Sequence, residues 1–164
     1  MKVKLIAIAA LGKNREIGLN GSLPWDLPDE HAQYLEKIKE KFVIIGRKNL
    51  EANNGDVEGA YPLVLSRSHR SSTETALFFT SLEHVMSYLE EAEVEEAFII
   101  GGAQIYELFL PYVTEFYWTE VDYSGDADTY FPDFSGFEWQ KVFEEQHQGW
   151  SLKKLIKVPE RFGV

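Results

Sequence analysis

The run Phe98-Ile99-Ile100-Gly101-Gly102-Ala103 joins three consecutive apolar residues to a glycine pair and a segment with helical character. A short apolar run that does not alternate with polar residues is typical of a strand covered on both faces, as in a parallel sheet between helices. The two glycines permit a tight turn after such a strand. These residues therefore predict a strand, a turn and a helix of an α/β protein.

The chain on either side repeats this pattern. Residues 5–11, 42–45 and 63–65 are also continuously apolar. Between the runs, apolar residues recur on one helical face in 31–38, where we assign His31, Tyr34, Leu35 and Ile38 to that face, and again in 82–89. Pro28 and Ser81 are suitable first residues or caps for these helices, and Pro111 ends a short helix over 103–110.

The last third of the chain changes character. Residues 115–123, 138–145 and 150–158 are rich in aromatic residues and are separated by turns that contain glycine, which indicates strands that end the sheet in antiparallel fashion. No internal repeat or linker interrupts the 164 residues. We predict one domain, residues 1–164, of the α/β class: a single mixed, mostly parallel central sheet flanked by helices, with C-terminal antiparallel strands.

Composition excludes several kinds of partner. The formal net charge of −11 opposes binding to nucleic acid or to anionic lipid. The apolar run 5–11 is short for a signal peptide and lacks a small-residue cleavage site after it, and no run approaches the roughly 20 residues that cross a bilayer. The chain has no cysteine, and its four histidines lack metal-ligand spacing. We expect a cytoplasmic protein that binds no nucleic acid, membrane or metal ion.

Basic residues follow two of the predicted strands. Gly46, Arg47 and Lys48 follow the run 42–45, and Arg67 follows the run 63–65, so we expect two basic loops beside the glycine pair. In open α/β sheets ligands bind beyond the carboxyl ends of the strands, and guanidinium groups there suit a phosphate. The residues alone leave open a second interpretation, in which these charges form a solvated rim.

An acid lies beside an aromatic residue at the start of the first helix. The segment Leu23-Pro24-Trp25-Asp26-Leu27-Pro28-Asp29-Glu30 leads into this helix, and Tyr34 follows Glu30 by one helical turn. A carboxylate beside an aromatic face can hold a flat heterocycle that carries N–H donors. The alternative is an acid that only interacts with the helix dipole, next to a core tyrosine.

Taken in order, these motifs resemble those of dihydrofolate reductases between residue 5 and about residue 132. The matching segments are Ile17-Gly18, Leu23-Pro24-Trp25, Leu27-Pro28-Asp29-Glu30, Gly46-Arg47-Lys48, Leu65-Ser66-Arg67, Ile100-Gly101-Gly102 with Ile105-Tyr106, and Asp128-Thr129-Tyr130-Phe131-Pro132. The resemblance implies a monomeric enzyme of folate and one-carbon metabolism that reduces 7,8-dihydrofolate to 5,6,7,8-tetrahydrofolate with NADPH. Hydride would reach C6 of the pterin, and a proton from water would reach N5.

The resemblance also implies roles for individual residues. The catalytic residues would be Glu30, which binds N3 and the 2-amino group of the pterin, with Trp25, Leu23 and Thr119, the last supporting Glu30. Substrate would be bound by Ile8, Ala9, Ala10, Glu30, Tyr34, Asn49, Asn53, Val57, Ile100, Tyr106 and Thr119. NADPH would be bound by Ala10, Ile17, Gly18, Gly46, Arg47, Lys48, Asn49, Leu65, Ser66, Arg67, Ile100, Gly101, Gly102, Ala103, Gln104, Ile105, Tyr106 and Thr129. Residues 12–25 would form a mobile loop that closes the site.

The chain departs from the family pattern at a few positions. Ala60 stands where the family has the arginine that binds the glutamate tail of folate, and Lys39, Lys41 and Arg70 are possible substitutes. Asn49, Asn53 and Ala127 replace a hydroxyl residue, an apolar residue and a glycine, respectively.

Three alternative functions remain open. The chain could be the pyrimidine reductase of riboflavin synthesis, which shares the fold, or a reductase of pterins that lack the tail. A module that binds a pterin without catalysis is the third.

Overall fold

The computed structural model describes residues 3–52, 57, 59–68 and 72–159. Its elements along the chain are β1 (Lys4–Leu11), β2 (Glu16–Gly18), α1 (Pro28–Ile38), β3 (Phe42–Gly46), α2 (Arg47–Ala52), β4 (Tyr61–Leu65), β5 (Leu77–Phe79), α3 (Leu82–Glu91), β6 (Glu96–Gly101), α4 (Ala103–Phe109), β7 (Glu115–Val121), β8 (Thr129–Tyr130), β9 (Trp139–His147) and β10 (Trp150–Lys157). Within the described part, no helix is long and apolar enough to span a membrane.

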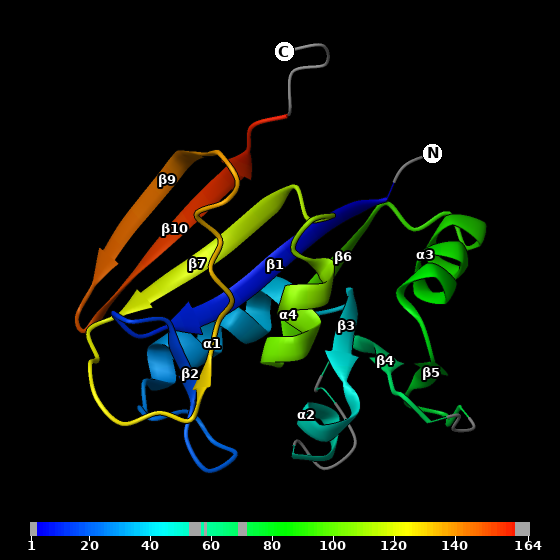
Figure 1. Cartoon of the computed structure of the whole chain (residues 1–164), viewed down its shortest axis with the longest axis horizontal. Coiled ribbons are helices and arrows are strands. Elements are labelled where there is room, and N and C mark those ends of the chain that lie inside the picture. The colour runs from blue at the N-terminus through cyan, green and yellow to red at the C-terminus, as the bar shows by residue number, and fades with distance from the viewer. Residues whose placement is uncertain (1–2, 53–56, 58, 69–71, 160–164) are drawn as a thin grey trace.

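Eight strands form the central sheet in the order β5-β4-β3-β6-β1-β7-β10-β9 (Figure 1). The first six run parallel, whereas β10 pairs antiparallel with β7 and with β9. The prediction of a mixed, mostly parallel sheet with C-terminal antiparallel strands is therefore confirmed.

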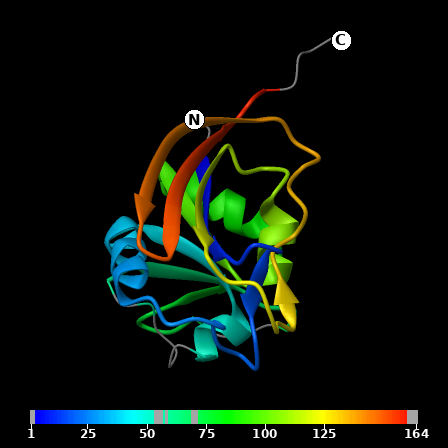
Figure 2. The same ribbon diagram turned by 90° about the vertical axis from the view of Figure 1, so that its left-hand side faces the viewer.

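Helices cover both faces of the sheet (Figure 2). On β1, Leu5 and Ala7 pack in the cluster that contains residues of α3 and α4, whereas Ile6 and Ile8 pack with Ile38 of α1 on the opposite face. Both faces of the strand are buried because side chains alternate along it, which explains why its sequence is continuously apolar.

The predicted helix starts are also confirmed. Pro28 occupies the first turn of α1. At α3, Ser81 is the N-cap, and its hydroxyl accepts a hydrogen bond of 3.1 Å from the backbone N–H of His84. On α1, however, His31 is exposed, and the buried position next to it belongs to Glu30. His31 nevertheless shares a helical face with Tyr34, as predicted, because the centroids of the two rings lie 5.9 Å apart.

Some elements differ from the sequence-based prediction. Arg47 and Lys48, which we expected in a loop, begin the helix α2, and Arg47 forms an (i, i+4) ion pair of 2.9 Å with Glu51. The strand β5 and the small sheet formed by β2 and β8 were not predicted. Each of these strands has two or three residues, too few to produce a periodic pattern, and each depends on its partner strand.

Candidate active site

Glu30 lies in the first turn of α1 and is only 5% exposed. Burial raises the pKa of its carboxyl group, because the low-dielectric surroundings penalise the charged form, while a hydrogen bond from Gln33 and the nearby His31 oppose this rise. A buried acid with a raised pKa is a candidate for chemistry.

Gln33 is the side chain that donates a hydrogen bond to this acid among the described residues: its Nε2 lies 3.0 Å from Glu30 Oε2. The sequence analysis overlooked Gln33, although its position three residues after Glu30 on the same helix could have revealed it. The predicted support of Glu30 by Thr119 stays a prediction. Thr119 lies on β7, opposite Ala10 of β1, and is 2% exposed.

Two tyrosines lie near Glu30. Tyr34 is one turn further along α1, and Tyr106 of α4 donates a hydrogen bond of 2.8 Å from its hydroxyl to the backbone oxygen of Ile8. Burial raises the pKa of both phenols, and the charge of Glu30 raises them further. An acid and two phenols from two helices thus interact with one another, and one of these phenols is held at Ile8 of β1.

The remaining predicted substrate residues divide between the two sheet faces. Ile8, Val57 and Ile100 are buried together on the face covered by α1, and Ala10 packs beside Trp25 on that side. Ala9, in contrast, packs in the cluster that contains residues of α3 and α4, so it could reach a ligand at Glu30 only through its backbone. Asn49 is half-buried in α2. Asn53 lies outside the described residues, as does Arg70.

Trp25 lies over the end of the sheet, where its ring is 5.6 Å from that of Tyr123. Its Nε1 is buried and has no hydrogen-bond partner within the described part of the chain. A buried indole N–H usually has a partner, and the same situation is found at Trp118, whose Nε1 is also buried without one among the described residues. Leu23, two residues earlier, is 46% exposed.

The glycine pair lies at the end of β6. Gly101 has φ +108°, and a Cβ on it would lie 2.9 Å from the Tyr106 ring, so no other residue fits there without strain. A Cβ on Gly102 would meet nothing within 4 Å. Ala103 begins α4, and Ile105 packs against Gly46 at the end of β3, where a Cβ would lie 3.1 Å from Ile105 Cγ1. Open space thus lies beside Gly102.

Basic residues border this space. Arg67 follows β4, whose last residue is Leu65, and its Nη2 lies 3.4 Å from Oε1 of Gln104 in α4. Ser66, between them, is buried, while Lys48 is exposed at the start of α2. The predicted cofactor residues of β3, β4 and β6 therefore meet at one edge of the sheet. The residues present suit a phosphate-bearing cofactor, since this edge combines two arginines, a lysine and an unobstructed glycine.

Ile17 and Gly18 are brought to Thr129 by the pairing of β2 with β8. A Cβ on Gly18 would lie 3.2 Å from Thr129 Cβ, so the strands pack closely. Asp128 accepts a hydrogen bond of 2.9 Å from the backbone N–H of Asn20. Residues 12–25 are thus attached to a distant segment, and their mobility stays a prediction.

Ala60 is half-buried and offers no charge for a carboxylate tail. Of the possible substitutes, Lys41 forms an ion pair of 3.0 Å with Glu96. Lys39 lies close to Gly59, the residue before Ala60: a Cβ added to Gly59 would be 3.6 Å from Cγ of Lys39.

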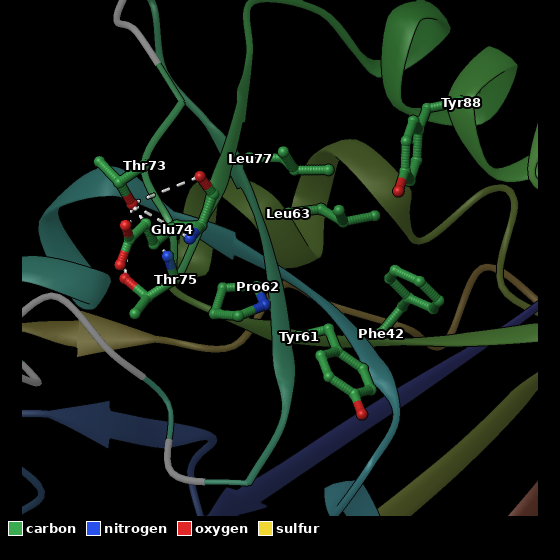
Figure 3. Close-up of a pocket in the computed structure, with 10 residues that line it drawn as sticks. Phe42, Tyr61, Pro62, Leu63, Thr73, Glu74, Thr75, Leu77 and Tyr88 are labelled. Carbon is green, nitrogen blue, oxygen red and sulfur yellow. Dashed lines mark hydrogen bonds between the residues drawn. The ribbon is translucent and has the colours of Figure 1, made fainter.

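A separate pocket of about 270 Å³ lies at the opposite ends of the strands (Figure 3). Phe42, Tyr61 and Leu77, the first residues of β3, β4 and β5, line it together with Tyr88 of α3. Its lining is mainly apolar and includes a single carboxylate, that of Glu74. Because it lies at the amino ends of the strands, away from Glu30, we do not consider it the active site. No group of three His, Asp or Glu side chains in the described residues could hold a metal ion.

Comparison with known proteins identifies the family. The family profile described as dihydrofolate reductase matches residues 4–155. The dihydrofolate reductase of Staphylococcus haemolyticus is 31% identical over 88% of this chain and 86% of its own length. That of Neisseria gonorrhoeae is 34% identical over 85% of this chain and 86% of its own length. "Dihydrofolate reductase 1" of Haloarcula marismortui is 28% identical over 96% of this chain and 94% of its own length.

A solved structure supports the fold. Dihydrofolate reductase from Enterococcus faecalis, complexed with NADP(H) and RAB-propyl, superposes with a TM-score of 0.82 over 94% of this chain and 96% of its own length, at 23% identity. The family match does not favour the pyrimidine reductase alternative. The chain belongs to the dihydrofolate reductase family.

Proposed function

We propose that this chain reduces 7,8-dihydrofolate to 5,6,7,8-tetrahydrofolate, with NADPH as hydride donor and with Glu30 as the residue that binds the pterin. Family membership makes the chain an NADPH-dependent oxidoreductase of folate metabolism. The observation that carries the role of Glu30 is its burial, at 5% exposure, in the first turn of α1 and one turn before Tyr34.

Glu30 binds the pterin through two acceptor oxygens. An ionised carboxylate accepts hydrogen bonds from the N3 proton and the 2-amino group of the ring, and such charge-assisted bonds are short and strong. The negative charge of Glu30 makes N5, on the opposite side of the pterin ring, more basic. Transfer of a proton from water to N5 is therefore favoured. Tyr34, Val57 and Ile100 cover the ring and exclude bulk water, while Trp25, Leu23 and residues 12–25 close the opening.

NADPH fits the edge that contains Gly102, Arg47, Lys48 and Arg67. When bound, it supplies the hydride for C6 of the pterin. The two arginines and the lysine would hold its phosphate groups, while Ala10, Ile17 and Gly18 would align the nicotinamide with the pterin.

The glutamate tail contributes little to binding in this proposal, because Ala60 replaces the arginine of the family. A charge-assisted contact of that kind is worth about 1.5 to 3 kcal/mol, or roughly 10- to 100-fold in affinity. A strong preference for the glutamylated substrate would contradict this small contribution of the tail. If Lys39→Met then abolished the preference, Lys39 would be the residue that binds the tail.

Further parts of the proposal concern assembly and location. The net charge of −11 supports a protein that does not bind nucleic acid. We also propose that residues 1–164 act as one domain, as a cytoplasmic monomer.

Oxidation of NADPH, followed optically, tests the function with three substrates. We expect dihydrofolate and a dihydropterin without the tail to react, and the pyrimidine ribosyl phosphate not to react. Glu30→Gln should lose activity at neutral pH and still bind NADPH, because Glu30 is not among the residues proposed to hold the cofactor. Unchanged turnover in this variant would refute the role of Glu30, and binding of pterin without turnover in the wild type would indicate the non-enzymatic alternative.

A further inference from the structure

We propose that Gln33 is a positioning residue of the active site, which orients the carboxylate of Glu30 toward the substrate. This inference rests on the proposed function of Glu30. Gln33 lies outside the segments that carry the family resemblance, so its role follows from its contacts in this chain.

The contact is a hydrogen bond within α1. Nε2 of Gln33 lies 3.0 Å from Oε2 of Glu30, three residues earlier. A carboxamide can donate only through its nitrogen, and an ionised carboxylate can only accept, so the amide has one favourable orientation here. Rotation of the Glu30 carboxyl group is restricted in turn, because its Oε2 is held. Oε1 and the second lone pair of Oε2 remain available for two parallel donors on a flat ring.

Packing alone does not explain a glutamine at this position. Gln33 is half-buried, and its Oε1 is buried with no hydrogen-bond partner among the residues that the structure describes. An unpaired buried acceptor is unfavourable, and an apolar side chain of similar length would avoid that cost. The hydrogen bond from Nε2 of Gln33 to Glu30 offsets the cost of the unpaired Oε1.

Gln33 also affects the charge of Glu30. Burial raises the pKa of Glu30, and the hydrogen bond from Gln33 and the exposed His31 lower it. Tyr34 of α1 and Tyr106 of α4 also interact with this acid, but a tyrosine is neutral near pH 7, and burial raises the pKa of both phenols further. Within the described residues, no Lys or Arg forms an ion pair with Glu30. The hydrogen bond from Gln33 is therefore the largest influence that lowers the pKa of Glu30 against the effect of burial.

The test compares two substitutions with opposite effects. Gln33→Met removes the donor at similar length, whereas Gln33→Lys replaces it with a cation. For each protein, kcat/KM for dihydrofolate is measured against pH, and the Glu30 carboxyl is titrated by NMR in enzyme labelled with carbon-13 at the glutamate carboxyl groups. Glu30→Gln identifies the signal. The same change at an exposed glutamine on β9, Gln140→Met, is the control.

We expect Gln33→Met to move the Glu30 titration, and the fall of kcat/KM on the acidic side, to higher pH. It should lower kcat/KM at neutral pH about tenfold, the effect of losing one charge-assisted hydrogen bond, with KM for NADPH unchanged. Gln33→Lys should move both profiles to lower pH, and Gln140→Met should move neither.

Profiles that coincide with the wild type in either folded Gln33 variant would overturn the proposal. The two opposite shifts keep the test informative if one variant does not fold. Failure of the proposed function would appear separately, as a wild-type enzyme that does not oxidise NADPH with dihydrofolate, while the NMR titration would still report on Gln33.

Discussion

The backbone N–H of Gly125 donates a hydrogen bond of 3.1 Å to Oε2 of Glu16, and these two residues are 109 positions apart. Oε1 of the same carboxylate accepts a hydrogen bond of 2.7 Å from the N–H of Asn14. Glu16 is only 1% exposed. A buried carboxylate thus joins the segment after β1 to the connection between β7 and β8, where Lys13 N also donates to the backbone oxygen of Tyr123 at 2.8 Å.

Replacement of Glu16 should destabilise the fold. Glu16→Ala leaves backbone N–H groups, including those of Asn14 and Gly125, without their acceptor, which costs about 1 to 3 kcal/mol. Glu16→Gln should cost less, because its amide oxygen can still accept from one of these donors. Urea unfolding followed by fluorescence measures the difference, with Glu138→Gln at an exposed position as the control. A Glu16→Gln protein as stable as the wild type would show that the two hydrogen bonds do not depend on the charge.

Stability should fall in acid partly through this same residue. Burial raises the pKa of Glu16, but hydrogen bonds from the N–H groups of Glu16, Asn14 and Gly125 outweigh it and hold the pKa below its ordinary value of 4.5. The unfolded chain therefore binds a proton first as the pH falls. The stabilisation is complete above pH 4.5 and is lost as the pH falls through the pKa of the folded state.

The predicted loss of stability in acid is tested by measuring the free energy of unfolding at a series of pH values from 7 downward. The Glu16→Gln protein should lose less stability than the wild type over the acidic range, because it no longer titrates at this position. Other acids with lowered pKa values, such as Glu96 and Asp128, titrate in both proteins, so the difference reports Glu16. A parallel loss in both proteins would contradict the assignment.

The two neighbouring glycines should respond differently to alanine. Gly101→Ala should destabilise the protein by about 2 to 4 kcal/mol, since its φ of +108° disfavours other residues and the new Cβ would lie 2.9 Å from the Tyr106 ring. Gly102→Ala should fold normally, because its Cβ meets nothing within 4 Å. If the cofactor lies at this edge, Gly102→Ala should still weaken NADPH binding. Thermal unfolding and NADPH titration together distinguish these effects, and equal destabilisation by both changes would be inconsistent with the geometry.

Glu30→Gln should stabilise the protein while it removes activity. Burial raises the pKa of Glu30, so the charged carboxylate is less stable in the folded chain than in the unfolded one. This cost is present at neutral pH and disappears in acid, below the ordinary pKa of 4.5, where the group is protonated in both states. A neutral amide should therefore add about 0.5 to 2 kcal/mol at pH 7, a trade-off common at active sites. Calorimetry at pH 7 and in acid measures it, and a gain that persists unchanged in acid would point to another cause.

Arg67 should distinguish NADPH from NADH. Its guanidinium lies at the end of β4 near Gln104, on the edge proposed for the cofactor. Arg67→Leu should raise KM for NADPH about tenfold and leave KM for NADH nearly unchanged, because only NADPH carries the additional phosphate. An equal effect on both cofactors would place Arg67 away from that phosphate.

Much of the fold and part of the site could be predicted from local pattern. Ile99 and Ile100 indicated a strand buried on both faces, since only a sheet between helices needs such continuous apolar character. Glu30 and Tyr34 were recognisable as neighbours because four residues make one turn of a helix. The prediction failed for Arg47, because a single helical turn after a strand is too short to show a period.

The amino-acid sequence by itself determined the sheet, the helices that cover it and the position of an acid at a helix start, because these depend on the periodicity and chemistry of neighbouring residues. Only the tertiary structure decided that Glu16 would reach Gly125, that Ala9 would face away from Glu30, and that Lys41 would pair with Glu96. Such contacts join residues far apart in the chain or depend on which face of a strand is covered. Their strength also depends on burial, and a local sequence pattern does not specify how deeply a residue is buried.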